Sequence, residues 1–139
     1  MSASFLEKFD GRLAGILTWQ AFDDLWRILA ASGGEWYVYD LAGEVPTQPA
    51  ADFNNALGIA AKMLADARKN SYCGAVYVDN AQAPEFVKVF DPLKMGTACG
   101  CSGQRILPRF VFSRLQPVAL ITKEPAEAPG FFAKMLGRR

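Results

Sequence analysis

The chain of 139 residues contains no histidine. Histidine is the side chain that most readily gains and loses a proton near neutral pH, and it is the commonest metal ligand. Its absence excludes Ser-His-Asp and Cys-His hydrolase mechanisms built from this chain alone, because both need an imidazole as the base. No other complete set of catalytic residues replaces it. The sequence therefore favours a protein that is not an enzyme, although cysteine chemistry stays open.

An excess of charge of either sign is also lacking. Lysine and arginine total 15 and aspartate and glutamate total 14, which leaves a formal net charge of +1. Such a chain has no overall field to attract nucleic acid or an anionic membrane. No apolar run approaches the length of a membrane span, and charged residues interrupt the apolar ones near the start. We expect a cytoplasmic protein without a membrane span and without a nucleic-acid partner.

The composition that remains is typical of one ordered domain. Hydrophobic residues make up 51% of the chain and charged residues 21%, which favours a packed core over disorder. We assign residues 1–122 to a single domain. Residues 123–130 have the composition of a proline-rich spacer. Residues 131–139 form a short apolar and basic C-terminal segment.

Three stretches have the spacing of amphipathic helices. Apolar residues recur at steps of three and four from Leu6 to Leu17, and again from Phe22 to Leu29. Whether residues 4–31 form one bent helix or two stays open. The most regular helical pattern covers residues 53–67, with Asp52 in the capping position.

Four stretches rich in β-branched and aromatic residues predict strands, at residues 35–41, 73–79, 85–90 and 109–115. Two short additions are expected: an edge strand at 44–47, which contains a proline, and an extension at 118–121. Alternation along the first strand places apolar side chains on both faces, which helices or a partner must cover.

These elements predict an α+β domain, in which helices pack on an antiparallel sheet of four to five strands. The order of elements is similar to that of the profilin-like and roadblock-like folds. The resemblance implies a fold and carries no function with it.

The stretch with the most reactive residues is the sequence CGCSG, within a long loop predicted at residues 93–108. Cys99 and Cys101 would be reactive if nearby amides or arginines lowered their thiol pKa. With Cys73 they could also bind a metal, but a structural zinc site usually takes four ligands, so a carboxylate or a second chain would have to complete it. The alternative is an ordinary turn with one buried thiol. We predict no cofactor and do not exclude a metal.

The same loop could bind an anion. Backbone amides around Gly100, Ser102 and Gly103 could surround a phosphate or carboxylate, and Arg105 and Arg109 could add charged hydrogen bonds. Arg114, further along, could do the same. No phosphate-binding loop or dinucleotide motif is present, so a solvated glycine loop with surface arginines is the alternative.

Aspartates at strand ends are the remaining acid–base candidates. Asp40, Asp79 and Asp91 each end a predicted strand. They could form a pair of catalytic carboxylates if those ends met at one edge of the sheet. Aspartate is also common at strand ends because it favours turns.

The C-terminal segment is a candidate for binding a partner protein. Phe131, Phe132, Met135 and Leu136 could share one face of a short helix behind the spacer. That helix could equally fold back on its own sheet. Taken together, these patterns favour a small non-enzymatic protein-binding, adaptor or regulatory domain, whose partner is another protein or a second copy. A redox or metal site on CGCSG and an anion-binding regulatory site are the alternatives.

Overall fold

Polar side chains begin each α-helix in the computed structural model, which describes residues 4–92 and 107–120. Thr18 and Asp52 accept hydrogen bonds from backbone N–H groups of the first turn, and for Asp52 the sequence predicted this role. Ser4 and Glu7 form a reciprocal capping box at the first helix. The helices are α1 (Phe5–Asp10), α2 (Trp19–Ala31) and α3 (Phe53–Leu64).

Helix α3 is shorter than predicted. It ends at Leu64, and a 3₁₀ turn, η1 (Ala65–Lys69), follows it directly. Helices often tighten in this way at their C-terminal ends, where carbonyl groups lack partners one turn ahead. The predicted helical face is nevertheless correct, because Leu57, Ala60, Leu64 and Ala67 are all buried.

Residues 4–31 form two helices, and the helical interpretation of Leu6 to Leu17 is wrong beyond Asp10. Strand β1 (Ala14–Gly15) separates α1 from α2 and pairs with β3 (Val76–Val78). Close by, the backbone N–H of Ile16 donates to the carbonyl of Val76 at 2.8 Å. Apolar residues at helical spacing over so few turns favour a helix only weakly. Pairing with a distant strand therefore decides the conformation of this segment.

Within the described ranges, five strands form one open antiparallel sheet in the order β1-β3-β4-β5-β2. The three strands not yet placed are β2 (Tyr37–Asp40), β4 (Phe86–Val89) and β5 (Phe110–Ser113). All are shorter than their predicted ranges, as is β3, which follows a left-handed glycine at Gly74 (φ 67°). The α+β fold with four to five antiparallel strands is thus confirmed.

The predicted edge strand at 44–47 does not form, and residues 118–120 are not a strand either. After β2 the chain turns, with the Gly43 N–H donating to the Asp40 carbonyl at 2.8 Å. Pro46 has no N–H to donate to a neighbouring strand. The chain instead returns to the residue before β2, where the Ala50 N–H donates to the Trp36 carbonyl at 2.8 Å.

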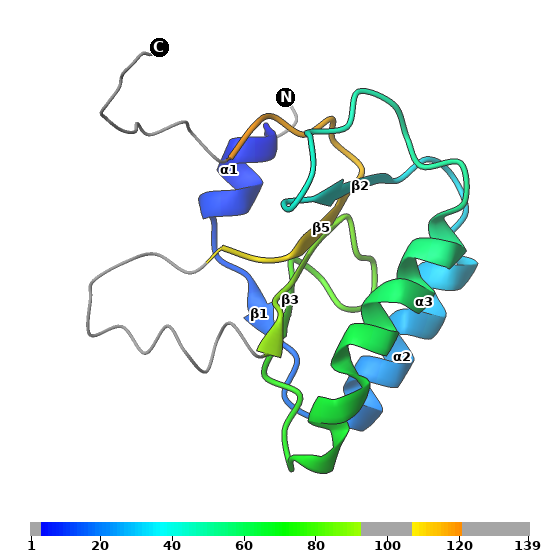
Figure 1. Ribbon diagram of the computed structural model, residues 1–139, viewed down its shortest axis with the longest axis vertical. Coiled ribbons are helices and arrows are strands. Elements are labelled where there is room, and N and C mark those ends of the chain that lie inside the picture. Colours follow the sequence, from blue (N-terminus) through cyan, green and yellow to red (C-terminus); the bar gives the residue numbers. More distant parts are fainter. Residues whose placement is uncertain (1–3, 93–106, 121–139) are drawn as a thin grey trace.

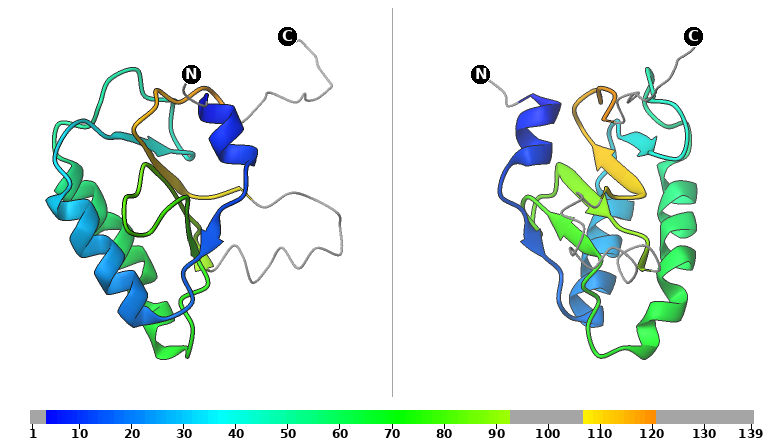
Figure 2. Two further views of the ribbon diagram at one scale, coloured as in Figure 1. Left: turned by 180° about the vertical axis from the view of Figure 1, so that it is seen from behind. Right: turned by 60° about the vertical axis from the view of Figure 1, so that its left-hand side comes forward.

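Helices cover both faces of the sheet, as Figures 1 and 2 show. Helices α2 and α3 lie side by side on one face, over Val76, Val87 and Phe112. On the other face, Phe5 and Phe9 of α1 pack on Phe86, Val111 and Tyr39. Alternation along the strands therefore produces a two-sided core. No helix within the described ranges is long and apolar enough to cross a membrane.

Candidate functional site

Most of the residues that the sequence suggested for chemistry lie outside the described ranges. In the predicted loop these are Cys99, Gly100, Cys101, Ser102, Gly103 and Arg105. In the C-terminal segment they are Phe131, Phe132, Met135 and Leu136. Their proposed roles in redox chemistry, metal binding, anion binding and partner docking stay predictions.

Cys73 lies in the core between η1 and β3. Its backbone N–H donates to the carbonyl of Leu17 at 2.9 Å, which ties this loop to the start of α2. Burial raises the pKa of the Cys73 thiol, so the reactive thiolate form is disfavoured. Among residues 4–92 and 107–120, no group of three or more acidic, histidine or cysteine side chains is placed to hold a metal ion.

Arg109 forms a two-point ion pair with Asp40, where β2 and β5 meet. Its Nε and one terminal nitrogen lie 2.8 and 3.1 Å from the two carboxylate oxygens. The hydrogen bonds to Arg109 hold the pKa of Asp40 below its usual value. The guanidinium also lies 5.0 Å from the Phe110 ring. An anion that bound Arg109 would have to compete with this carboxylate.

The structure does not bring Asp40 and Asp79 together. Asp40 is the last residue of β2 and Asp79 follows β3. These two strands run in opposite directions, so the two carboxylates lie at opposite ends of the sheet. Asp79 instead pairs with Lys8 at 2.9 Å. These two carboxylates therefore cannot act as an acid–base pair.

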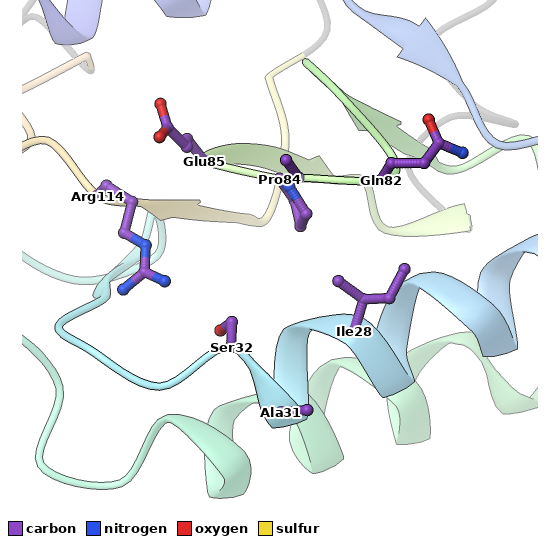
Figure 3. A pocket seen from close by; sticks show the side chains of 8 residues that line it. Ile28, Ala31, Ser32, Gln82, Pro84, Glu85 and Arg114 are labelled. Carbon is purple, nitrogen blue, oxygen red and sulfur yellow. The ribbon is translucent and has the colours of Figure 1, made fainter.

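A pocket of about 480 Å³ opens between the C-terminal end of α2 and the turn that joins β3 to β4 (Figure 3). Its volume is in the range of small-ligand and side-chain binding sites. Its lining is mixed: apolar side chains from the helix and the turn face a guanidinium and several polar groups. The lining residues are Ile28, Ala31, Ser32, Gln82, Ala83, Pro84, Glu85 and Arg114.

The turn that forms one wall is held by side-chain hydrogen bonds. Asp79 Oδ1 accepts from the backbone N–H groups of Asn80, Glu85 and Phe86 at 2.8, 3.1 and 3.2 Å. Asn80 Oδ1 in turn accepts from the N–H of Gln82 at 3.0 Å. Such Asx interactions fix a turn without any partner outside it. The β3–β4 wall of the pocket is thus preformed.

The opposite wall is the C-terminal end of α2, where Ser32 is the C-cap residue. Its hydroxyl donates to the Leu29 carbonyl at 2.7 Å and accepts from the indole N–H of Trp36 at 2.9 Å. The chain then passes through Gly33 and Gly34, both in the left-handed region at φ 64° and 71°. Glycine adopts this conformation without steric cost, so the chain can turn sharply from the helix into β2.

Arg114 completes the pocket and is held in place by three neighbours. Its guanidinium lies 4.3 Å from the Trp36 ring centroid, and one terminal nitrogen donates to the Glu35 carbonyl at 3.0 Å. The same group lies against Gly34, where a Cβ would stand 2.6 Å from the nitrogen. A cation stacked on an aromatic face and donating to a backbone carbonyl is well ordered before any ligand arrives.

Sequence patterns identified only part of this site. Arg114 was among the candidate anion-binding arginines, but nothing in the sequence placed it beside Ile28 or Pro84. The detectable signals were Gly33-Gly34 ahead of Trp36, and the turn-forming pair Asp79-Asn80.

Comparison of the chain with protein-family models, with curated proteins and with solved structures finds no match.

Proposed function

We propose that this chain is a small non-enzymatic protein-binding domain, which acts as an adaptor or regulator by receiving part of a partner protein. The observation that supports this function is the pocket between α2 and the β3–β4 turn. Its two walls and its arginine are held by contacts within the domain, so little conformational freedom would be lost on binding. A cytoplasmic location stays a prediction from the sequence.

The chemistry of the pocket favours binding over catalysis. Its ionisable side chains are Glu85 and Arg114, and it contains no nucleophile beside a base. Ile28 and Pro84 offer apolar surface for a partner side chain, while Gln82 and Arg114 offer hydrogen-bond donors (Figure 3). A short peptide segment of a partner fits such a lining. The cysteine and anion alternatives stay predictions, since their loop is outside the described ranges.

Peptide selection tests the proposal directly. A displayed library of random peptides is selected against the full chain, and the recovered peptides are measured by fluorescence polarisation. Two variants locate the binding site: Ile28→Trp fills the pocket, and Ile59→Trp makes the same change at an exposed position on α3 that does not line it. Circular dichroism confirms that both variants fold.

We expect Ile28→Trp to weaken peptide binding at least about tenfold and Ile59→Trp to leave it unchanged. A selection without binders, or binders that Ile28→Trp does not weaken, would overturn the proposed function. Sedimentation of the chain alone shows whether a second copy is itself the partner. Self-association lost in Ile28→Trp and kept in Ile59→Trp would support the pocket as the interface between copies.

A further inference from the structure

We infer that the pocket recognises an acidic side chain of a partner protein, through Arg114, next to an apolar side chain that packs on Ile28 and Pro84. This inference rests on the proposed function and adds the chemistry of the partner. The supporting observation is the number of Arg114 guanidinium donors that are already in use. Arginine has five N–H donors, and within the described ranges one hydrogen bond from this guanidinium is present, to the Glu35 carbonyl.

No carboxylate in the described part of the chain forms an ion pair with this guanidinium. Ion pairs found there include Lys8–Asp79, Arg27–Asp24, Arg68–Asp23 and Arg109–Asp40. Arg68 and Arg109 each hold both oxygens of their carboxylate. Arg114 differs from them, because an aromatic ring and a backbone carbonyl fix it, and no ion pair to it is found in the described part of the chain.

The direction of the side chains supports the same conclusion. In Figure 3 the Arg114 guanidinium points toward the end of α2, whereas the Glu85 carboxylate points away from that helix. The backbone N–H of Arg114 donates to the Glu85 carbonyl at 3.0 Å, so the two residues are fixed together with their charges apart. The positive charge thus faces the pocket and the negative charge faces outward.

The end of α2 opposes an anion only weakly. A helix C-terminus carries roughly half a negative charge, spread over its last carbonyl groups. Here the Leu29 carbonyl already accepts from both the N–H and the hydroxyl of Ser32. The full charge of a guanidinium exceeds this partial charge, and arginine pairs with a carboxylate through two parallel hydrogen bonds.

A double-mutant cycle on a selected peptide tests the inference. The acidic residue of the peptide is changed to its amide, and Arg114 is changed to Gln in the full chain. Arg27→Gln is the matched control, since Arg27 is exposed on α2 and does not line the pocket. Glu85→Gln removes the opposite charge at the same pocket. Fluorescence polarisation gives the affinity for each combination, and circular dichroism reports the fold.

We expect aspartate or glutamate in the selected peptides, and a loss of about tenfold or more for either single change. The two changes together should cost no more than one alone, because each removes the same contact. Arg27→Gln should have no effect, and Glu85→Gln should leave binding equal or tighter. Affinity should also fall as salt is added.

Two failures can be told apart. Peptides that lose binding in Ile28→Trp but contain no acidic residue, or bind Arg114→Gln as tightly as the original chain, overturn the acidic partner and leave the pocket as a binding site. A selection that yields no pocket-dependent peptide overturns both proposals. If Arg114→Gln does not fold, Arg114→Lys keeps the charge and loses the two-point geometry, and equal binding by that variant would refute the two-point contact.

Discussion

Replacing Asp79 with alanine should destabilise the domain and loosen one wall of the pocket. Asp79 is the point where α1, β3 and the β3–β4 turn meet. One of its carboxylate oxygens accepts three backbone N–H groups, and the other lies 2.9 Å from Lys8 Nζ. Alanine keeps the backbone of the turn and removes all four contacts at once.

The four contacts do not contribute equally. The N–H groups of Asn80 and Glu85 are exposed, and water can replace the lost oxygen there. The N–H of Phe86 is partly buried, and Phe86 itself is fully buried under α1. An unsatisfied buried donor costs about 1–3 kcal/mol, and a partly exposed ion pair contributes about 0.5–1 kcal/mol. We therefore expect Asp79→Ala to lower the free energy of unfolding by about 1.5–4 kcal/mol.

Urea unfolding followed by tryptophan fluorescence at neutral pH measures this change, with the midpoint shifted and the slope preserved. Asp24→Ala is the matched control, since Asp24 is 48% exposed and pairs with Arg27 on the same helix face. It should cost less than about 1 kcal/mol. Equal losses in the two variants, or a loss below about 1 kcal/mol for Asp79→Ala, would refute the argument that this carboxylate organises the turn.

Three further changes test the rest of the structure. Gly34→Ala should destabilise more than Gly33→Ala in the same unfolding assay: both positions have positive φ, but an added Cβ meets the guanidinium only at Gly34. Leu64→Ala should cost about 2–5 kcal/mol, because Leu64 is fully buried, whereas Ile59→Ala at a half-exposed position should cost less than about 1 kcal/mol. The Cys73 thiol should resist alkylation in the folded protein and react once urea unfolds it, as peptide mapping by mass spectrometry would show; rapid labelling in the folded state would contradict its burial.

Local patterns in the sequence determined the element types over most of the described chain. The helical face of α3 and its cap at Asp52 follow from the spacing of apolar residues and one aspartate. The aromatic and β-branched stretches identified β2 to β5, and alternation in β2 predicted that both faces of the sheet would be covered. These features depend on neighbours within a few residues, so they can be read along the chain.

Other features required contacts between distant segments. The apolar period through Ile16 predicted a helix, but pairing with β3 made residues 14–15 a strand. The predicted edge strand at 44–47 does not form, and Pro46 there has no N–H to donate to a neighbouring strand. Strand order also decided that Asp40 and Asp79 lie at opposite ends of the sheet. Pairing partners cannot be read from local periodicity, since they depend on the free energy of the whole fold.

The pocket depended entirely on tertiary structure. Its residues come from the end of α2, the β3–β4 turn and the residue after β5, which are separated along the chain by up to 86 positions between Ile28 and Arg114. The sequence by itself determined the α+β class, the cap of α3 at Asp52 and the lack of histidine. Tertiary packing of α2 on the sheet placed the Arg114 guanidinium over the Trp36 ring and opposite an apolar wall. Only folding brings those side chains within contact distance.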